Sequence, residues 1–470
     1  MWRCLLALAL VFCSPNAMAA GSGINGGALS PLWVVPFAGI LLSIALAPVT
    51  APSFWHHHFG KATAFWSLAF IVPFAIHHGV AVALHEVVHT LLLEYLPFII
   101  LLFALFTVSG GIHIRGSLHA TPALNTGLLA LGTILASIMG TTGAAMLLIR
   151  PLLRANDHRK HKAHVVVFFI FLVANIGGAL TPLGDPPLFL GFLKGIDFFW
   201  TTKAMFLPTL TASSILLVAF YATDRWLARH ESATAFARRD PTPDAPIRID
   251  GKVNIAILLA ILASVLWSGL WKPGLTMEIA GTPLELQNVL RDIALVALAW
   301  GSWKLTPTAV RRANDFSWEP IVEVAKLFAG IFLTIIPAIA MLHAGNEGTL
   351  APLVAFVTGA DGQPIDVRYF LLTGALSSFL DNAPTYLVFF NLAGGNPVDL
   401  MGPLATTLAA ISAGAVFMGA NTYIGNAPNF MVKSIAESRG VAMPGFVAYF
   451  GWAMLVLTPV YLLTAWLFFA

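Results

Sequence analysis

The sequence predicts an all-α membrane protein with about ten transmembrane helices and two re-entrant hairpins, arranged as two inverted-topology repeats. Of its 470 residues, 58% are hydrophobic and 10% are charged, and the mean hydropathy is +0.82. Soluble domains carry about 25% charged residues, so most of this chain must lie in lipid. In addition, polar segments broken by Gly and Pro recur after a shift of 241 residues: residues 178–187 align with 419–428, and 140–144 align with 381–385.

The first 20 residues are typical of a secretory signal peptide. Arg3 supplies the positive start, Leu5–Phe12 is an apolar run too short to span a bilayer, and Ala17–Ala19 fits an A-x-A cleavage site. An uncleaved anchor is the alternative interpretation. Both cysteines, Cys4 and Cys13, lie in this segment. A processed chain would therefore contain no disulfide, thiolate metal site or cysteine nucleophile.

Apolar runs of membrane-spanning length follow along the rest of the chain. The first repeat, residues 21–223, contains spans at about 33–48, 62–84, 96–113, 165–194 and 204–223, with a hairpin at about 119–149. The second repeat, residues 253–470, contains spans at about 253–271, 291–304, 319–344, 403–435 and 445–469, with a hairpin at about 367–394. Residues 224–252, which are charged and contain three prolines, form a cytoplasmic linker between the repeats.

Basic residues set the orientation of these spans. They gather in alternate loops, most densely at Arg150–Lys162 and Arg225–Lys252, and the other loops hold few. This asymmetry marks the cytoplasmic side and predicts a multi-pass protein of the bacterial inner membrane, with both mature termini in the periplasm. The net charge of +3 is too small to indicate a nucleic-acid partner.

Two of the apolar runs are interpreted as hairpins because of the basic residues around them. A single crossing by residues 119–149 would put Arg115 and the Arg150–Lys162 cluster on opposite sides of the membrane, whereas a hairpin keeps both inside. We place its tip at residues 140–143, where Gly140 and Gly143 permit a tight turn. The matching tip of the second repeat is residues 381–384, which end in Pro384.

Only two of the 22 acidic residues are predicted at mid-depth in the membrane, Asp185 and Asp381, one in each repeat. A carboxylate there costs about 2.5–3.5 kcal/mol on insertion scales, so such residues are usually functional. An acid that holds either a proton or a cation, and never both, couples the fluxes of the two. The sequence therefore predicts exchange of Na⁺ for H⁺, with no other cofactor.

Oxygen-bearing side chains and helix breaks around the two acids suit a hard cation such as Na⁺. The candidate ion- and proton-binding residues are Asp185, Asp381, Asn382, Thr141, Thr142, Thr181, Asn421, Thr422 and Asn426, with Asn175 as a weaker candidate. The residues that break the helices or turn the hairpins are Gly140, Gly143, Pro182, Gly184, Pro186, Pro384, Gly425 and Pro428. Each Asp could instead cap the following helix, and capping is compatible with ion binding.

The motifs at these breaks resemble those of the ion-transporter superfamily, which includes sodium/proton antiporters and citrate carriers. Residues 175–185 are similar to the broken-helix motif of NhaD-type antiporters, and residues 378–384 to their hairpin-tip motif. The resemblance implies a homodimer and an elevator motion of the hairpin domain. The first tip, residues 140–143, lacks the Asn and Pro that such tips often have. The carboxylate at Asp381 favours cation exchange, and coupled carriage of citrate or another small carboxylate is the alternative.

Two further functional classes stay open at this point. His85, Glu86 and His89 match H-E-x-x-H, which on a helix binds Zn²⁺ and would indicate an intramembrane metalloprotease, although zinc needs a third protein ligand. Broken helices also build passive channels. Paired breaks in two repeats favour alternating access instead, and therefore a transporter rather than an enzyme.

Overall fold

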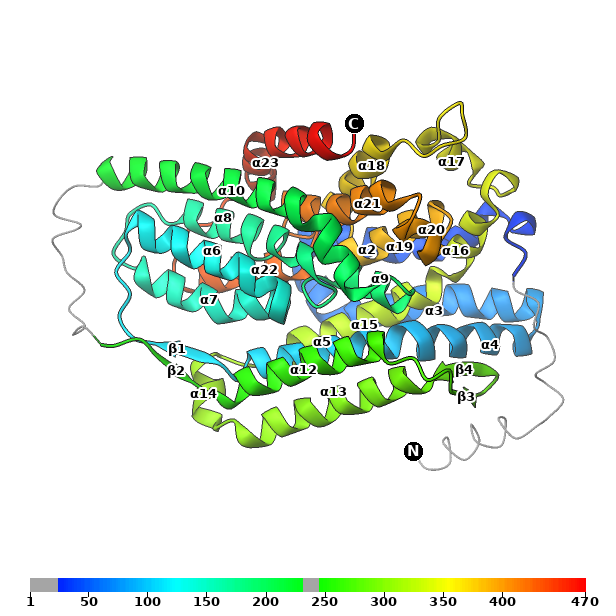
Figure 1. Ribbon diagram of the computed structural model, residues 1–470, viewed down its shortest axis with the longest axis horizontal. Helices are drawn as coiled ribbons and strands as arrows, with labels where there is room; N and C mark the ends of the chain where they lie inside the picture. Colours follow the sequence, from blue (N-terminus) through cyan, green and yellow to red (C-terminus); the bar gives the residue numbers. More distant parts are fainter. Residues whose placement is uncertain (1–23, 231–244) are drawn as a thin grey trace.

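The computed structural model describes residues 24–230 and 245–470, so the predicted signal peptide and residues 231–244 of the charged linker lie outside the described residues. The described chain is helical apart from two small two-stranded sheets. Most of its long helices run in roughly the same direction (Figure 1). This arrangement confirms the prediction of an all-α membrane protein.

The first part of the chain forms three long apolar helices. They are α2 (Val35–Thr50), α3 (Pro52–His78), and α4 (Val80–Thr90), which continues through a π-helical turn, η3 (Leu91–Tyr95), into α5 (Leu96–Ser109). The chain turns at Gly79, whose φ of 94° is easily adopted only by Gly. The predicted boundaries of the second and third spans, 62–84 and 96–113, were therefore wrong, because the apolar runs before His77 and after Gly79 were joined into one span.

The rest of the first half contains the predicted hairpin and broken helix. Helices α6 (Pro122–Met139) and α7 (Thr141–Ala155) pack together and meet at Gly140, with φ of 82°. The broken helix follows as α8 (Ala163–Leu172), a 3-10 turn η4 (Ile176–Leu180) and α9 (Pro186–Leu193), and leads to α10 (Phe198–His230).

The second half begins with helices that pack beside the first three. They are α12 (Val253–Leu270), α13 (Leu286–Leu305), α14 (Thr308–Ala313), α15 (Glu319–Thr334), α16 (Ile336–His343) and α17 (Ala351–Val357). Between α12 and α13 lies the hairpin of β3 (Thr276–Ile279) and β4 (Thr282–Glu285). The predicted span 319–344 is bent by 42° between α15 and α16.

The last part of the chain repeats the order of the first hairpin region. Helices α18 (Asp366–Phe379) and α19 (Asn382–Leu392) pair, and after α20 (Pro397–Met401) come α21 (Ala405–Met418), the turn η6 (Gly419–Asn421), α22 (Ala427–Ser438) and α23 (Phe446–Phe468). A shift of 241 residues places α6–α7 on α18–α19. The same shift places η4 on η6, and α9 on α22. Both halves thus break their helices at corresponding positions.

Eight helices among the described residues are long and apolar enough to cross a membrane, or nine if the bent pair α15–α16 counts as one span. One of these eight is α6, which was predicted as part of a hairpin, so eight of the ten predicted spans have a counterpart when the bent pair is included. The other two fall short because α21 and α22 are separated by a turn and because α13 carries Arg291, Asp292 and Lys304. The re-entrant course of α6–α7 and α18–α19 through a bilayer stays a prediction.

The loops that follow and precede the first hairpin lie at the same end of the molecule. Arg154 Nη2 donates to the carbonyl of Ile114 at 2.7 Å, and Arg150 lies 3.3 Å from Asp315. Nearby, β1 (His113–Arg115) pairs with β2 (Arg248–Asp250), which places the linker's end there too (Figure 1). Four of the basic residues assigned to the cytoplasm therefore share one end: Arg115, Arg150, Arg154 and Arg248.

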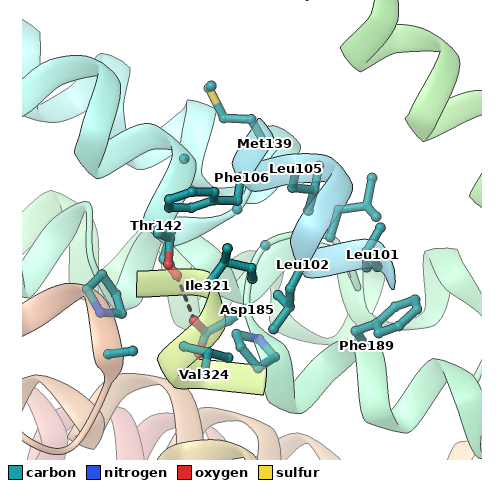
Figure 2. Close-up of a pocket in the computed structure, with 18 of the residues that line it drawn as sticks. Leu101, Leu102, Leu105, Phe106, Met139, Thr142, Asp185, Phe189, Ile321 and Val324 are labelled. Carbon is teal, nitrogen blue, oxygen red and sulfur yellow. Dashed lines mark hydrogen bonds between the residues drawn. The ribbon is translucent and has the colours of Figure 1, made fainter. Parts of the chain in front are cut away.

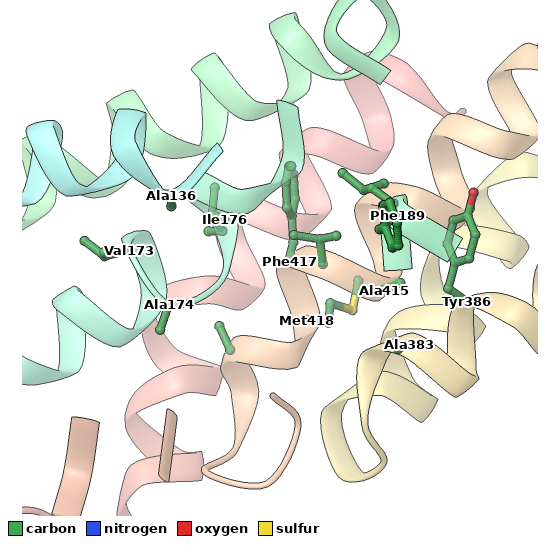
Figure 3. Packing of buried hydrophobic residues seen from close by; sticks show 14 of the residues in the cluster. Ala136, Val173, Ala174, Ile176, Phe189, Ala383, Tyr386, Ala415, Phe417 and Met418 are labelled. Atoms are coloured by element: carbon green, nitrogen blue, oxygen red, sulfur yellow. The ribbon is translucent and has the colours of Figure 1, made fainter. Parts of the chain in front are cut away.

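The core lies between the two breaks. Side chains from η4 and α8, such as Ile176 and Val173, approach Phe417 and Met418 of α21, with Phe189 and Tyr386 at the other end of the cluster (Figure 3). These residues are almost completely buried. The apolar packing surrounds the polar residues of the breaks and keeps water from them.

Candidate ion-binding site

Each break is shaped by two glycines whose backbones touch. A Cβ atom at Gly184 would lie 2.1 Å from the carbonyl oxygen of Gly178, and one at Gly425 would lie 2.6 Å from that of Gly419. Real Cβ atoms do not approach this closely, so only Gly fits. The chain thus leaves η4 or η6 and folds back on itself before α9 or α22 begins, which exposes backbone polar groups to the site.

Side-chain hydroxyl groups tie each break to the neighbouring hairpin in the same way. In the first half, Ser137 donates to Gly177 and Thr181 donates to the carbonyl of Ser137. In the second half, Ser378 donates to Met418 and Thr422 donates to the carbonyl of Ser378. These bonds hold the tip of each hairpin against the break of its own half.

The carboxylate of Asp185 lies where the two breaks meet, and it is 1% exposed. Its Oδ1 accepts hydrogen bonds from Thr141 Oγ1 at 2.9 Å and from Asn426 Nδ2 at 3.1 Å, and its Oδ2 accepts one from Asn382 Nδ2. The three donors come from the first hairpin tip, the second break and the second hairpin tip. One acid therefore joins both halves of the protein.

The residues in this cluster correspond to each other under the 241-residue shift. Asn426 occupies the position in the second half that Asp185 occupies in the first, and Asn382 corresponds to Thr141. The site is thus built from two equivalent pairs, with the carboxylate in one half and a neutral amide in its place in the other. Asp381 corresponds to Gly140 and has no acidic counterpart.

Helix ends supply the electrostatic compensation for this buried acid. Four helices begin at the cluster, α7, α9, α19 and α22, and each has its N-terminus there: Asp185 is the N-cap of α9 and Asn426 that of α22. Helix N-termini carry partial positive charge, which stabilises an anion. Within the described residues, no Lys, Arg or His side chain hydrogen-bonds to Asp185. A bound proton or metal cation could therefore occupy the carboxylate without competition from a fixed side-chain charge.

A cavity of about 90 Å³ adjoins Asp185 (Figure 2). One wall is formed by the first hairpin tip and the breaks, including Gly140, Gly143, Pro182, Gly184, Pro186 and Pro428. Its apolar wall comes from α5 and α15, with Leu105, Phe106 and Ile321 over the site. The predicted helix-breaking residues of the first half thus line one small space beside the acid.

The structure gives the other predicted residues different places. Asp381 is half-buried, accepts a hydrogen bond from Ala383 N at 3.0 Å and so caps α19. Thr142 lines the cavity. Thr181, Thr422 and Asn421 bond to the hairpins rather than to Asp185. Pro384 lies buried in the first turn of α19, and Gly425 packs on Gly419.

The sequence reasoning missed Asn429 and gave Asn175 little weight. Asn175 Nδ2 donates to Asn429 Oδ1 at 2.7 Å, and Asn429 Nδ2 donates to the carbonyls of Gly419 and Thr422. Asn426 Nδ2 also donates to the carbonyl of Ala174 at 3.0 Å. The spacing of Asn429, three residues after Asn426 on one helix face, was the signal that could have revealed it.

The two histidines of the H-E-x-x-H motif lie in α4, one turn apart, with ring centroids separated by 6.1 Å. Among the described residues, no group of three or more His, Cys, Asp or Glu side chains is placed to hold a metal ion. The motif therefore finds no third ligand in the part of the chain that the structure describes.

Comparison with known families agrees with this architecture. A family model described as "Putative citrate transport" matches residues 26–469. The chain belongs to this family. The match to the citrate-transport family includes both hairpins, both breaks and every residue that contacts Asp185.

A curated relative gives the same general assignment. The chain is 25% identical over 376 residues to a protein of Synechocystis named as an uncharacterized transporter, slr0753; the match covers 74% of this chain and 78% of the relative. Together with the citrate-transport family, it identifies the protein as a multi-pass membrane transporter.

Proposed function

We propose that the protein is a secondary active transporter of the bacterial inner membrane that exchanges Na⁺ for H⁺ at the site around Asp185. The observation that carries this proposal is the buried carboxylate held between the two repeats by neutral donors alone. Asn382 Oδ1, on the same amide that donates to Asp185, is a buried acceptor with no hydrogen-bond partner in the described structure. A carboxylate beside a free amide oxygen offers the oxygen ligands that a hard cation prefers.

Occupancy of this site by one cation at a time provides the coupling. When Asp185 carries a proton, its side chain is neutral and no longer attracts Na⁺. When Na⁺ binds, the proton must first leave. Alternating access then carries one ion in each direction. The elevator motion and the homodimer that the family resemblance implies are part of the same proposal.

Proton movement in everted membrane vesicles tests the exchange. With a pH gradient established and monitored by a fluorescent dye, adding Na⁺ should dissipate the gradient in vesicles that contain the protein and not in vesicles that lack it. Li⁺ is included as a second small cation. A gradient that stays unchanged on addition of either ion would contradict the proposal.

Asp381 is proposed as the second acid that shares the cation and proton, and Asp381→Asn tests this role. Asn is as good an N-cap as Asp, so the hydrogen bond from Ala383 is retained while the charge is lost. We expect Na⁺-dependent proton movement to fall to background, with the amount of folded protein unchanged in size-exclusion profiles.

Asp399→Asn is the matched control for this variant. Asp399 is exposed and lies in the first turn of α20, so it tests the loss of an acid at a helix start away from the site. Its exchange should equal that of the wild type. Full exchange by Asp381→Asn would remove Asp381 from the site and leave Asp185 as its only acid.

The second candidate function is carriage of citrate or another small carboxylate, coupled to Na⁺ or H⁺. The description of the family favours it. The four helix N-termini at Asp185 also favour it, because helix N-termini bind anions once a cation or proton has neutralised the acid. Uptake of labelled citrate by the same vesicles distinguishes the two: exchange without uptake supports the antiporter, and Na⁺- or H⁺-dependent uptake supports the carrier.

A further inference from the structure

A second, larger cavity lies at the end of the molecule opposite to the basic loops. Its volume is about 870 Å³, and a neighbouring cavity adds about 380 Å³. Both are lined by Leu193, Gly195, Lys272, Glu285, Asn288 and Arg291. We call the two cavities together the vestibule. Ligand sites for small molecules usually occupy about 300–1,000 Å³, so the vestibule has room for a multivalent organic anion.

The vestibule and the cavity at Asp185 follow each other along the same two helices. The vestibule is lined by Leu96, Pro97 and Ile100 of α5 and by Leu193 of α9. The cavity at Asp185 is lined by Leu101, Leu102 and Leu105 of α5 and by Phe189 of α9. The two spaces are therefore about one helical turn apart on each helix. Phe189 is buried between them.

Arg291 marks the boundary between these spaces. Its side chain is 1% exposed, and its guanidinium lies 5.9 Å from the centroid of the Phe189 ring. Its Nε donates to Asp292 at 2.8 Å and its Nη1 to Asn288 at 3.1 Å. Its Nη2 lies 2.8 Å from the same Asp292 oxygen without hydrogen-bond geometry, and so it has no hydrogen-bond partner in the described structure. A buried, unused guanidinium N–H is suited to a carboxylate.

Three acids of the vestibule have partners. Glu94 Oε1 pairs with Lys194 at 2.5 Å, Asp292 pairs with Arg291, and Glu285 Oε2 accepts from the neutral amides of Gln287 and Asn288, while Glu94 Oε2 has no hydrogen-bond partner in the described structure. Lys272 is exposed, and no ion pair or hydrogen bond joins it to another described residue. The donors left for a ligand are thus Arg291 Nη2 and the Lys272 ammonium, both of which favour an anion.

We propose that the vestibule is a binding site for polycarboxylate anions, with Arg291 and Lys272 as its recognition residues, and that it is the first station on the route to Asp185. This inference rests on the second candidate of the proposed function, because the anion goes on to the cavity at Asp185 only if that site carries carboxylates. The Arg291 fork binds one carboxylate and Lys272 a second, so a di- or tricarboxylate is held more tightly than a monovalent anion. Phe189 separates the bound anion from Asp185.

Citrate binding to the purified full-length protein in lipid nanodiscs tests the site, with isothermal titration as the readout. The variant Arg291→Gln with Asp292→Asn removes the guanidinium without leaving a buried acid unpaired. We expect its dissociation constant for citrate to rise about tenfold or more, as for loss of a charged hydrogen bond. Lys272→Gln, at an exposed position where folding is not at risk, should raise it severalfold.

A control variant tests whether the effect belongs to the vestibule. Lys252→Gln, which removes an exposed lysine at the opposite end, should bind citrate as the wild type does. Sulfate and acetate should compete at least about tenfold more weakly than citrate, since neither offers two carboxylates. Equal competition by sulfate would overturn the polycarboxylate assignment, and unchanged citrate affinity in both vestibule variants would overturn the site.

Failure of this inference can be told from failure of the proposed function. If the wild type binds no citrate but Na⁺ still dissipates a pH gradient, the vestibule proposal is overturned and the ion site at Asp185 stands. If citrate binds as expected but Asp185→Asn leaves Na⁺-dependent proton movement intact, the ion site is overturned and the vestibule is retained as an anion site.

Discussion

Asp185→Asn is expected to abolish cation-coupled transport. The substitution keeps the shape of the side chain but removes a buried charge that donors from both halves of the protein hold. Loss of one partner of a buried charge interaction costs about 2–5 kcal/mol, so we expect Na⁺-dependent proton movement to fall by about a hundredfold or more. Everted vesicles with matched amounts of protein provide the measurement.

A paired variant distinguishes loss of the charge from damage to the site. Asn426 is the counterpart of Asp185 in the other half and lies 3.1 Å from it. Asp185→Asn combined with Asn426→Asp therefore moves the carboxylate across the site while keeping one acid and one amide. We expect this double variant to recover part of the exchange. Wild-type exchange by the single Asp185→Asn variant would contradict the assignment.

Gly184→Ala is expected to have the second largest effect, through the fold rather than the charge. The added Cβ would lie 2.1 Å from the carbonyl oxygen of Gly178, and neither backbone segment can move without displacing Asp185 or η4. Overpacking of this kind costs about 1–3 kcal/mol and occasionally more. We expect a lower thermal midpoint for the purified protein and loss of transport even in the fraction that stays folded.

Two other glycines provide the comparison. Gly425→Ala, at the corresponding position of the second half, should be destabilising to a similar degree, because its Cβ would lie 2.6 Å from Gly419. Gly127 lies on an exposed face of α6 with no atom within 4 Å of an added Cβ. Gly127→Ala should leave the protein as stable or more so, since Ala favours helix over Gly. A Gly184→Ala protein that unfolds at the wild-type temperature would show that the break can relax.

Much of the fold could be predicted from the sequence because Gly and Pro residues mark the positions at which the helices break. The hairpin turn at Gly140, the broken helix around Pro182 and the matching break before Asn426 all fall where the repeated motifs predict them. The turn at Gly79 was missed because apolar runs lie before His77 and after Gly79 and together have the length of one span. In a chain this hydrophobic, a short His-His-Gly interruption does not by itself distinguish a turn from the interior of a helix.

The residues of the site could be predicted from the sequence, but their arrangement in space could not. Spacing alone placed Asp185, Thr141, Asn382 and Asn426 at the breaks, and these four residues meet. The expectation of two equivalent acids did not distinguish their settings: Asp185 has an amide as its counterpart, while Asp381 caps a helix. Which side chains face each other across two halves depends on packing between residues far apart in the sequence, and no local pattern records it.

The amides that join the two breaks have a mechanical consequence. Asn426 donates a hydrogen bond to the backbone carbonyl of Ala174, and Asn175 donates one to Asn429. These hydrogen bonds connect the two repeats beside Asp185. If one repeat moved relative to the other, these hydrogen bonds would break in the buried interior of the protein, where the loss of a hydrogen bond is costly. We therefore expect the two breaks to move together as one rigid body when the ion is displaced. Relative movement would then be confined to the apolar surface at which α5 and α15 contact that body.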